Sequence, residues 1–494
     1  MLPTSHHRIP TVVRVFATVL AVLGGLAAVL VVRAAMMESQ QPDVEPSEVP
    51  EVREGAAKRL GEAIRFETIS PSEYDAEELA PFEQLQAYLT QAFPRVHDRI
   101  RREEISPCSL LYTWRGSNPD LKPALLMSHL DVVPVESELE EWEHPPFSGE
   151  IADGYIWGRG ALDIKTGVIG ILEAAETLLA HDIQPERTQM FAFGCDEEVG
   201  GQKGAKIISK LLKKRGVQPK YVLDEGQAIT KGIVPGIEGP VALIGLGEKG
   251  YVTLELTAKA KGGHSMMPPK QTAVGILSEA ITRIEDNPMP ARLNEPARKM
   301  FETLGPELPF YQQIVFANLW LLKPVLLGQL ANKKTTNATI RTTTAVTVVR
   351  GGDTENVLPQ KATAKVNFRI APGETIEDVE RHVRQVVGDE RVEIETPERN
   401  FMSNPSPISR TETEAYRKIG RSVRRVFGEE TIVAPALMLG GTDSRHYTDI
   451  ADDVYRFIPM ILGPEDTERI HGLNERIGVD NYRNIVRFYM EMMD

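Results

Sequence analysis

The sequence is poor in cysteine, in net positive charge and in long hydrophobic runs. It has only two cysteines, Cys108 and Cys195, among 494 residues, which excludes a disulfide framework and a zinc site built on Cys-x-x-Cys pairs. We therefore expect no disulfide bond, and any metal should be held by histidine and carboxylate side chains. Lys plus Arg number 56 against 70 Asp plus Glu, a formal charge of −14. This balance argues against nucleic acid as a partner, because phosphate binding needs clustered basic residues.

One long apolar run is present, at residues 15–32, with Arg8 and Arg14 before it and Arg33 after it. It is long enough to span a bilayer, and its basic leading flank predicts a cytoplasmic N-terminus. Two interpretations compete, an uncleaved signal anchor, which we favour, and a signal peptide. Residues 40–50 hold three prolines among polar residues, a composition typical of an extended linker. Residues 1–50 are thus expected to be a signal anchor or signal peptide followed by a linker. The folded part is expected outside the cytoplasm, anchored to the membrane, or secreted or luminal if the N-terminal apolar segment is cleaved.

The remaining chain is too long for one hydrophobic core. Helical spacing at residues 60–66, 82–93 and 168–179 alternates with short apolar runs at 124–127, 190–193 and 221–223. This alternation predicts an α/β unit with a mainly parallel sheet over residues 51–248. From residue 249 the pattern changes to strands of alternating polarity at 251–258, 343–349 and 362–370. We expect a separate α+β insertion over residues 249–400, after which residues 401–494 return to the first unit.

The three short apolar runs each lead into a potential metal ligand, namely His129, Asp196 and Asp224. Ligands collect at the carboxyl ends of parallel strands, so these side chains should share one edge of the sheet. Asp131 lies two residues after His129, where a carboxylate can orient the imidazole. Each motif taken alone has a plainer interpretation: a surface His-x-Asp triplet, an exposed acidic turn at residues 196–198, and Asp163 as the N-cap of a helix.

Taken together and in order, the motifs resemble a known family. They are WEHPPFSG at 142–149, GRGALDIK at 158–165, IRTTTA at 340–345, VNFR at 366–369 and GTDSR at 441–445, along with His129, Asp163, Glu198, Asp224 and His471. Residues 51–494 resemble the dizinc aminoacylase/carboxypeptidase family, in the branch of carboxypeptidase S and the N-fatty-acyl-amino acid synthase/hydrolases. The resemblance implies a parallel-sheet dizinc catalytic domain in two parts, residues 51–248 and 401–494, with a lid or dimerisation domain inserted at 249–400.

The resemblance also implies the roles of individual residues. Two zinc ions per chain would be bridged by Asp163 and held by His129, Glu198, Asp224 and His471, with Asp224 beside His129 and His471 at the other ion. Glu197 would be the general base and Asp131 the support of His129. His264 would be a lid residue that, in dimeric relatives, reaches the partner's active site. The substrate would be held by Asn356, Arg369 and Gly441.

The expected activity is zinc-dependent hydrolysis of N-acyl-amino acids to release a free amino acid, with fatty-acyl substrates and reversal toward synthesis both open. A carboxypeptidase acting on short peptides is the alternative, and a non-catalytic scaffold a remote one. Expected partners are a small-molecule or short-peptide substrate, a membrane if the N-terminal helix is uncleaved, and a second copy bound through the lid. An apolar stretch at residues 310–327 predicts helix packing or a subunit interface, or alternatively a groove for a long acyl chain.

Overall fold

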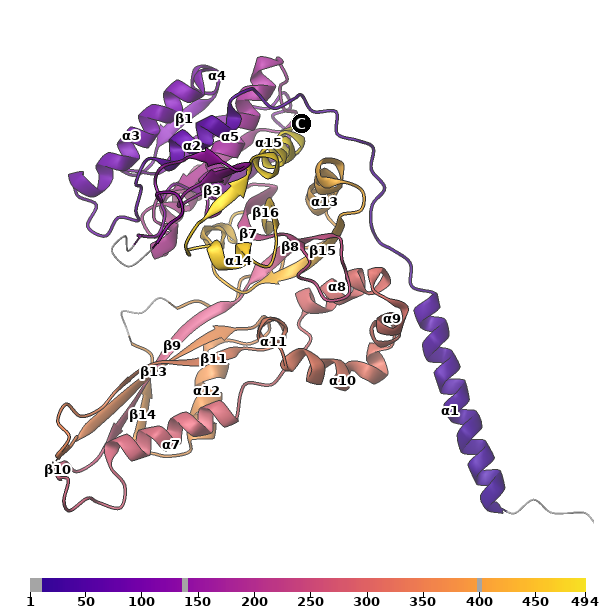
Figure 1. Ribbon diagram of the computed structural model, residues 1–494, viewed down its shortest axis with the longest axis vertical. Coiled ribbons are helices and arrows are strands. Elements are labelled where there is room, and N and C mark those ends of the chain that lie inside the picture. The colour runs from indigo at the N-terminus through magenta and orange to yellow at the C-terminus, as the bar shows by residue number, and fades with distance from the viewer. Residues whose placement is uncertain (1–10, 136–140, 398–401) are drawn as a thin grey trace, which may run out of the picture.

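The computed structural model describes residues 11–135, 141–397 and 402–494 (Figure 1). Its largest element is an eight-stranded mixed sheet with strand order β1-β2-β6-β3-β7-β16-β8-β15. The neighbouring pairs β6–β3, β3–β7, β7–β16 and β8–β15 are parallel. The predicted α/β unit with a mostly parallel sheet is thus confirmed. The strands are β1 (Arg101–Glu104), β2 (Leu110–Trp114), β3 (Ala124–His129), β6 (Gln189–Gly194), β7 (Tyr221–Lys231), β8 (Pro240–Glu248), β15 (Ile432–Met438) and β16 (Val454–Leu462).

Helices cover both faces of this sheet, because its central strands are apolar on both sides. On β3, Leu126 faces a core that contains Leu172 of α5. Leu125 and Met127 point the other way, into a cluster with Ile208 of α6. The helices of this unit are α2 (Ala56–Ile64), α3 (Ala76–Ala92), α4 (Pro94–Arg99), α5 (Lys165–Ala180), α6 (Ala205–Lys214), α13 (Glu414–Phe427), α14 (Asp466–Arg469) and α15 (Val479–Met493).

A second, four-stranded antiparallel sheet begins after a single intervening residue, Lys249, with strand order β11-β13-β9-β14. Two helices, α7 and α12, pack on it around a core of its own. We call this part the lid; its predicted end near residue 400 lies outside the described residues. Its elements are β9 (Gly250–Lys259), β10 (Gly263–His264), α7 (Ala273–Asp286), α8 (Glu295–Leu304), α9 (Phe310–Ala317), α10 (Leu319–Ala331), α11 (Lys334–Ile340), β11 (Thr343–Arg350), β12 (Val357–Leu358), β13 (Lys361–Ile370), α12 (Ile376–Val387) and β14 (Val392–Glu395).

A small third sheet connects two distant parts of the chain. Its strands are β4 (Ile151–Ala152), β5 (Tyr155–Trp157) and β17 (Arg476–Gly478). Trp157 pairs with Arg476 across β5 and β17, and Gly158 donates a backbone hydrogen bond to the carbonyl of Glu475. The glycine-rich segment after β5 is therefore held against the segment that carries His471.

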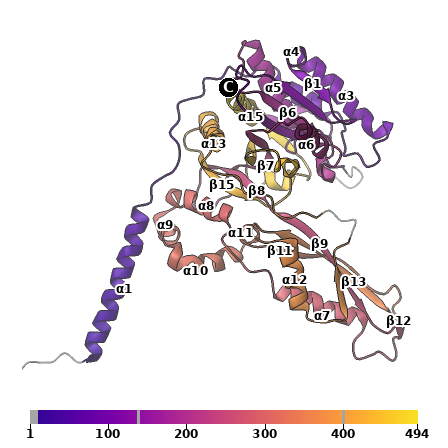
Figure 2. The same cartoon turned by 180° about the vertical axis from the view of Figure 1, so that it is seen from behind.

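The N-terminal apolar run forms helix α1 (Thr11–Ala35), which projects from the body in both views (Figures 1 and 2). Residues 12–35 are long and apolar enough to cross a membrane. The following segment is extended, as predicted, but it is bonded to the body. The Gln41 side chain exchanges hydrogen bonds of 2.7 and 3.1 Å with the backbone of Val433, and Ser47 donates to Glu491 at 2.6 Å.

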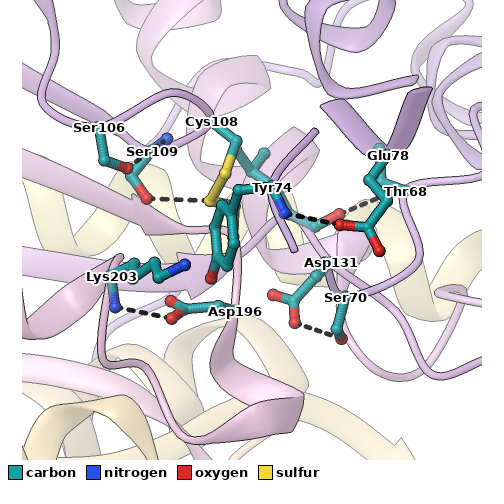
Figure 3. The surroundings of a disulfide bond; sticks show 12 residues. Thr68, Ser70, Tyr74, Glu78, Ser106, Cys108, Ser109, Asp131, Asp196 and Lys203 are labelled. Carbon is teal, nitrogen blue, oxygen red and sulfur yellow. Dashed lines mark hydrogen bonds between the residues drawn. A yellow bond between two sulfur atoms is a disulfide. The ribbon is translucent and has the colours of Figure 1, made fainter. Parts of the chain in front are cut away.

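The expectation of no disulfide bond is wrong. Cys108 and Cys195 form one, with 5.7 Å between their Cα atoms (Figure 3). The two cysteines are 87 residues apart in the sequence, so spacing gave no sign of their pairing. They meet because Cys108 lies just before β2 and Cys195 lies just after β6. These two strands are neighbours in the sheet.

Candidate metal centre

His129 is the last residue of strand β3, so it lies at the edge of the sheet formed by the carboxyl ends of the parallel strands. The residue is 1% exposed. Its Nδ1 lies 2.9 Å from the backbone carbonyl oxygen of Asp131 and 3.4 Å from that residue's Oδ1. A proton held on Nδ1 by these acceptors leaves the Nε2 lone pair free, the state in which histidine binds a metal.

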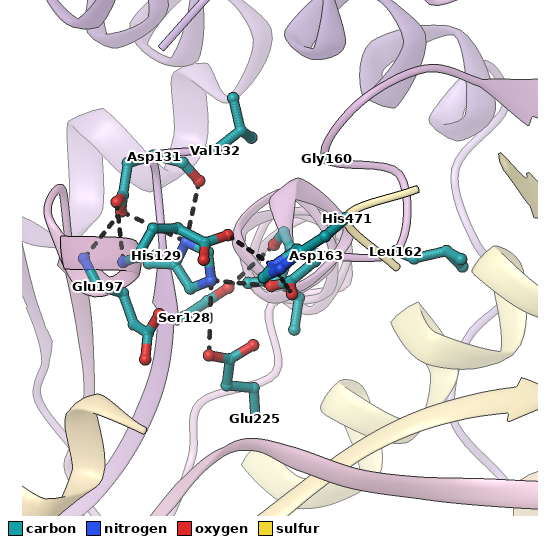
Figure 4. A network of polar contacts seen from close by, with 12 residues as sticks. Ser128, His129, Asp131, Val132, Gly160, Leu162, Asp163, Glu197, Glu225 and His471 are labelled. Carbon is teal, nitrogen blue, oxygen red and sulfur yellow. Dashed lines mark hydrogen bonds and ion pairs between the residues drawn. The ribbon is translucent and has the colours of Figure 1, made fainter. Parts of the chain in front are cut away.

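Asp163 lies between two histidines that come from distant parts of the chain (Figure 4). Its Oδ1 is 3.1 Å from Nε2 of His129, and its Oδ2 is 3.0 Å from Nε2 of His471. The capping alternative fails, because α5 begins at Lys165 with no side-chain cap. One carboxylate oxygen facing each imidazole is the arrangement expected of a ligand shared by two cations.

His471 reaches this position through an unusual backbone conformation. Its φ is 61°, in the left-handed region, which non-glycine residues adopt only where the surroundings impose it. The next residue, Gly472, has no room for a side chain, since a Cβ there would come 2.1 Å from the carbonyl oxygen of Glu468. Nε2 of His471 also lies 3.2 Å from Oε1 of Glu198.

A buried ion pair between Arg159 and Glu475, which was not predicted from the sequence, holds the segments that carry Asp163 and His471. Oε1 of Glu475 accepts hydrogen bonds from the backbone N–H groups of Gly160, Leu162 and Asp163. Its Oε2 accepts from Nη1 of Arg159 at 2.7 Å, and Nη2 of that arginine donates to the carbonyl of His471. Little in the sequence indicated this pair. Arg159 lies near Asp163 and Glu475 lies near His471, but nothing in the sequence indicates that they contact each other.

Asp131 orients the acidic turn as well as His129. The turn Glu197–Val199 is a single 3-10 turn that follows β6. Both carboxylate oxygens of Asp131 accept backbone hydrogen bonds of 3.2 Å, one from the N–H of Glu197 and one from that of Glu198. Ser70 donates a further bond of 2.7 Å. The carboxylate predicted to support the histidine thus also fixes the predicted general base.

The structure brings Glu225, and not Asp224, to His129. Oε1 of Glu225 is 3.5 Å from Nε2 of the histidine. The Asp224 carboxylate instead accepts a hydrogen bond of 2.8 Å from the backbone N–H of Ser444. Neighbouring side chains on a strand point to opposite faces, so the carboxylate that faces His129 belongs to Glu225, next to the predicted ligand Asp224. The adjacent Asp224 and Glu225 within β7 offered two carboxylates, and the sequence did not indicate which one faces His129.

Ligand atoms of these residues gather in two overlapping sets. Those of His129, Glu197 and Glu225 lie within 4.8 Å of one another, as do those of His129, Asp163 and Glu198. Burial, with Asp163 close by, raises the pKa of Glu225 to about 8. Hydrogen bonds with Asp163 and Glu198 raise the pKa of His471 to about 10. Crowded carboxylates around imidazole nitrogens fit divalent cations of the zinc type, which take nitrogen and oxygen ligands.

A cavity of about 810 Å³ opens over this cluster and is lined by both sheets. Arg369 and Gly441, which are predicted substrate-binding residues, both line it. Lys249 lines it too, with its pKa lowered to about 8 by burial and by the nearby Arg369. Apolar side chains also line it, namely those of Met438, Ile458, Met460, Leu462 and Ile470. None of residues 310–327 lines this cavity, so that stretch does not form a groove over the cluster.

His264 and Asn356 lie elsewhere, at the far tip of the lid around β10 and β12 (Figure 2). The two segments are paired, with the Ser265 N–H donating to the Asn356 carbonyl at 3.1 Å. Both side chains are exposed, and neither lines the cavity. The structure therefore brings these two predicted residues together, but not to the site of their own chain.

Comparison with known proteins agrees with this geometry. Residues 125–494 match the model of peptidase family M20/M25/M40. The chain is 42% identical over 453 residues to an N-fatty-acyl-amino acid synthase/hydrolase of Xenopus tropicalis, covering 90% of this chain and 87% of the relative. It is 38% identical to a probable carboxypeptidase S-like protein of Dictyostelium discoideum (95% and 92%), and 30% identical to carboxypeptidase S of Saccharomyces cerevisiae (90% and 84%).

Solved structures share the fold. An M20 family metallo-carboxypeptidase from Sulfolobus solfataricus aligns with a TM-score of 0.65 and 19% identity, covering 89% of this chain and 99% of that one. Human carnosine dipeptidase 1 aligns with a TM-score of 0.60 and 18% identity, covering 89% and 96%. Together with the matched family model, these likenesses show that the chain belongs to peptidase family M20/M25/M40 and is a metallohydrolase of amide bonds.

Proposed function

We propose that this protein hydrolyses N-acyl-amino acids to a free amino acid and a carboxylic acid, with long-chain fatty-acyl compounds among its substrates. The observation that carries the proposal is the cavity over the ligand cluster, whose lining includes the basic side chains of Lys249 and Arg369 as well as several apolar side chains. A substrate with a free carboxylate at one end and an acyl chain at the other matches both. The relative from Xenopus tropicalis, which is named for this substrate class, supports it further.

The metal centre would hold two zinc ions. His129, Glu225 and Asp163 would bind one, and Asp163, Glu198 and His471 the other. When bound, such ions polarise an amide carbonyl and make water a better nucleophile. The fit rests on the donor atoms described above, since imidazole nitrogens and carboxylate oxygens are the usual zinc ligands outside cysteine sites.

Glu197 would act as the general base. Its carboxylate lines the cavity, and burial together with the neighbouring Glu225 raises its pKa well above the usual range for glutamate. In this role Glu197 takes the proton of the attacking water and then passes it to the amine that leaves. Asp131 would serve as a positioning residue, because it binds the N–H of Glu197 and orients His129.

Arg369 would bind the substrate's free carboxylate, with Lys249 as a second positive charge at the same side of the cavity. Arg369 is kept in place by the ring of Tyr251, which lies 4.8 Å from its guanidinium carbon. A guanidinium offers two parallel N–H donors to a carboxylate. Gly441 would let the substrate approach the backbone, because it lines the cavity and has no side chain.

A second copy of the chain would complete the site. His264 and Asn356 are exposed, paired at the lid tip and away from their own cavity. In a homodimer formed through the lid, this tip would enter the partner's cavity and donate hydrogen bonds to the reacting carbonyl and the substrate. The Cys108–Cys195 disulfide and helix α1 support a location outside the cytoplasm, where disulfides persist.

The acyl preference can be tested with N-acyl-phenylalanines from acetyl to oleoyl on the zinc-loaded full chain. Each methylene buried against the apolar side chains of the cavity should add up to about 0.8 kcal/mol to transition-state binding, so kcat/KM should rise with chain length. A profile that does not change with length would contradict the acyl assignment. Replacing Arg369 with Ala should raise KM for free carboxylates and leave amidated analogues almost unaffected.

A carboxypeptidase acting on short peptides is the second candidate, because two relatives carry that name. Both reactions leave a free amino acid, and both use the same base and carboxylate site. Assaying one preparation with N-oleoyl-phenylalanine and with a blocked dipeptide separates them. A higher kcat/KM for the dipeptide would favour the carboxypeptidase. Product formation from oleate and phenylalanine would show that the reaction also runs toward synthesis.

A further inference from the structure

Helices α9 and α10 carry large apolar side chains that stay exposed in the described structure. Phe310, Tyr311, Trp320 and Val325 are 48%, 68%, 63% and 55% exposed. In α10 only Leu326 is buried, although the helix is apolar all round. Several large apolar side chains exposed on two neighbouring helices are a common sign of a binding surface.

Within the sequence of α9, α10 and α11 the charged side chains are all of one sign. Residues 308–340 contain no aspartate or glutamate, but they include Lys323, Lys333 and Lys334. Apolar side chains flanked by lysines, with Trp and Tyr among them, are the composition of helices that lie at the surface of a phospholipid bilayer.

The shape of the pair also suits a surface location. Helix α9 has 8 residues and α10 has 13, so neither alone reaches the length needed to span a bilayer. Their axes are bent by 114° at Asn318. Such a bent pair can place its apolar side chains in the outer part of one leaflet without crossing the membrane.

Helix α1 meets this pair at the position where it would leave the membrane. Nε of Arg33 donates to the carbonyl of Ala317 at 3.1 Å, and Nδ2 of Asn318 donates to the carbonyl of Leu30 at 3.0 Å. Both bonds join the bend between α9 and α10 to the C-terminal end of α1, and the views in Figures 1 and 2 agree on this contact. A bilayer around α1 would therefore have its outer surface beside α9 and α10.

We propose that α9 and α10 form a lipid-binding surface that inserts Phe310, Tyr311, Trp320 and Val325 into the outer leaflet while the lysines contact phosphate groups. The protein would thus contact the membrane twice, through α1 and through the lid. This inference does not depend on the reaction proposed above, because none of these residues lines the cavity.

Trp320 is a natural probe for the test. Trp114 and Trp157 are buried, and Trp142 packs against the guanidinium of Arg159, 5.5 Å from the ring centroid. The full chain would be reconstituted in phosphatidylcholine nanodiscs, with and without bromine on the acyl chains, which quenches indole fluorescence only at short range. Subtracting a W320F sample isolates the signal of Trp320. We expect blue-shifted emission that brominated lipid quenches.

Two variants complete the experiment. Leu321→Asp with Val325→Asp places charge on the exposed surface, so the quenching of Trp320 should be lost while the thermal unfolding midpoint stays unchanged. Val349→Asp, at an equally exposed apolar residue on β11, is the matched control and should quench like the parent. Emission typical of indole in water would overturn the proposal. So would a blue shift that brominated lipid does not quench, because that result would assign the surface to a second copy of the chain.

Discussion

Arg159 and Glu475 form an ion pair of 2.7 Å that is almost completely buried. Breaking such a pair from one side leaves a charge with no partner in the interior. We therefore expect Arg159→Met to lower the free energy of unfolding by about 3–5 kcal/mol. Urea unfolding of the full chain measures this. Arg298→Met, which breaks a pair with Glu302 whose two side chains are 48% and 47% exposed, is the control and should cost at most about 1 kcal/mol.

The assignment of Glu225 in place of Asp224 is tested by metal content. Glu225→Ala should lose one of the two ions, because it removes a carboxylate from the set around His129. Asp224→Asn should keep both, because its oxygen bonds to the Ser444 N–H and not to the cluster. Elemental analysis after dialysis against zinc-free buffer gives the counts. The opposite pattern would restore Asp224 as the ligand.

The role of Glu197 predicts a variant that binds metal without turning over. Glu197→Gln keeps the size of the side chain but cannot take a proton, so kcat should fall by about 10²–10⁴-fold. The metal content should equal that of the parent chain. A loss of metal together with activity would mean that Glu197 is a ligand and not the base.

Metal uptake should depend on pH. Hydrogen bonds with Asp163 and Glu198 raise the pKa of His471 from 6.5 to about 10, so in the metal-free chain its proton must leave before Nε2 can bind an ion. Zinc affinity should therefore rise between about pH 6.5 and 10. In the metal-free chain this histidine stabilises the fold fully below pH 6.5, and that contribution is lost as pH rises through 10. Titration calorimetry in buffers of different ionisation enthalpy should detect the released protons.

The disulfide predicts a clear response to reductant. It closes a loop of 87 residues, and replacing both cysteines with serine should lower the free energy of unfolding by about 2–5 kcal/mol. Dithiothreitol should bring the parent chain to the same value and leave the double variant unchanged. If the reductant has no effect on the parent, the two thiols are not bonded in the purified protein.

Much of the fold was predictable because apolar residues recur at a different spacing in its strands than in its helices. The central β3, β6 and β7 and the lid strands β9, β11 and β13 correspond to apolar or alternating runs in the sequence. His129 was chosen because it follows an apolar strand, whereas Asp163, Glu198 and His471 were chosen from their motifs and the resemblance to a known family. The structure places Asp163 beside both histidines and Glu198 beside His471. The side of β7 that faces this edge was not predictable, since Asp224 and Glu225 are adjacent and only the three-dimensional register separates them.

Other features depend on contacts between distant segments. Nothing near Cys108 indicates Cys195, since their meeting requires that β2 and β6 be neighbours. The same holds for Glu475, which looks like an ordinary loop residue until the pairing of β5 with β17 brings it to Arg159. The apolar stretch of the lid was recognised, but its composition could not show that it stays exposed and meets α1.

The bonds of Gln41 and Ser47 give the segment after α1 a mechanical role. Gln41 is hydrogen-bonded to Val433, and Ser47 to Glu491. The segment at residues 36–50, which we call the strap, is therefore held against the body and is not a flexible linker. An anchored enzyme would then stand at a set height above the lipid and keep one orientation. Proteolytic release just after Ala35 would leave the strap in place, so the freed enzyme would retain the same body as the anchored one.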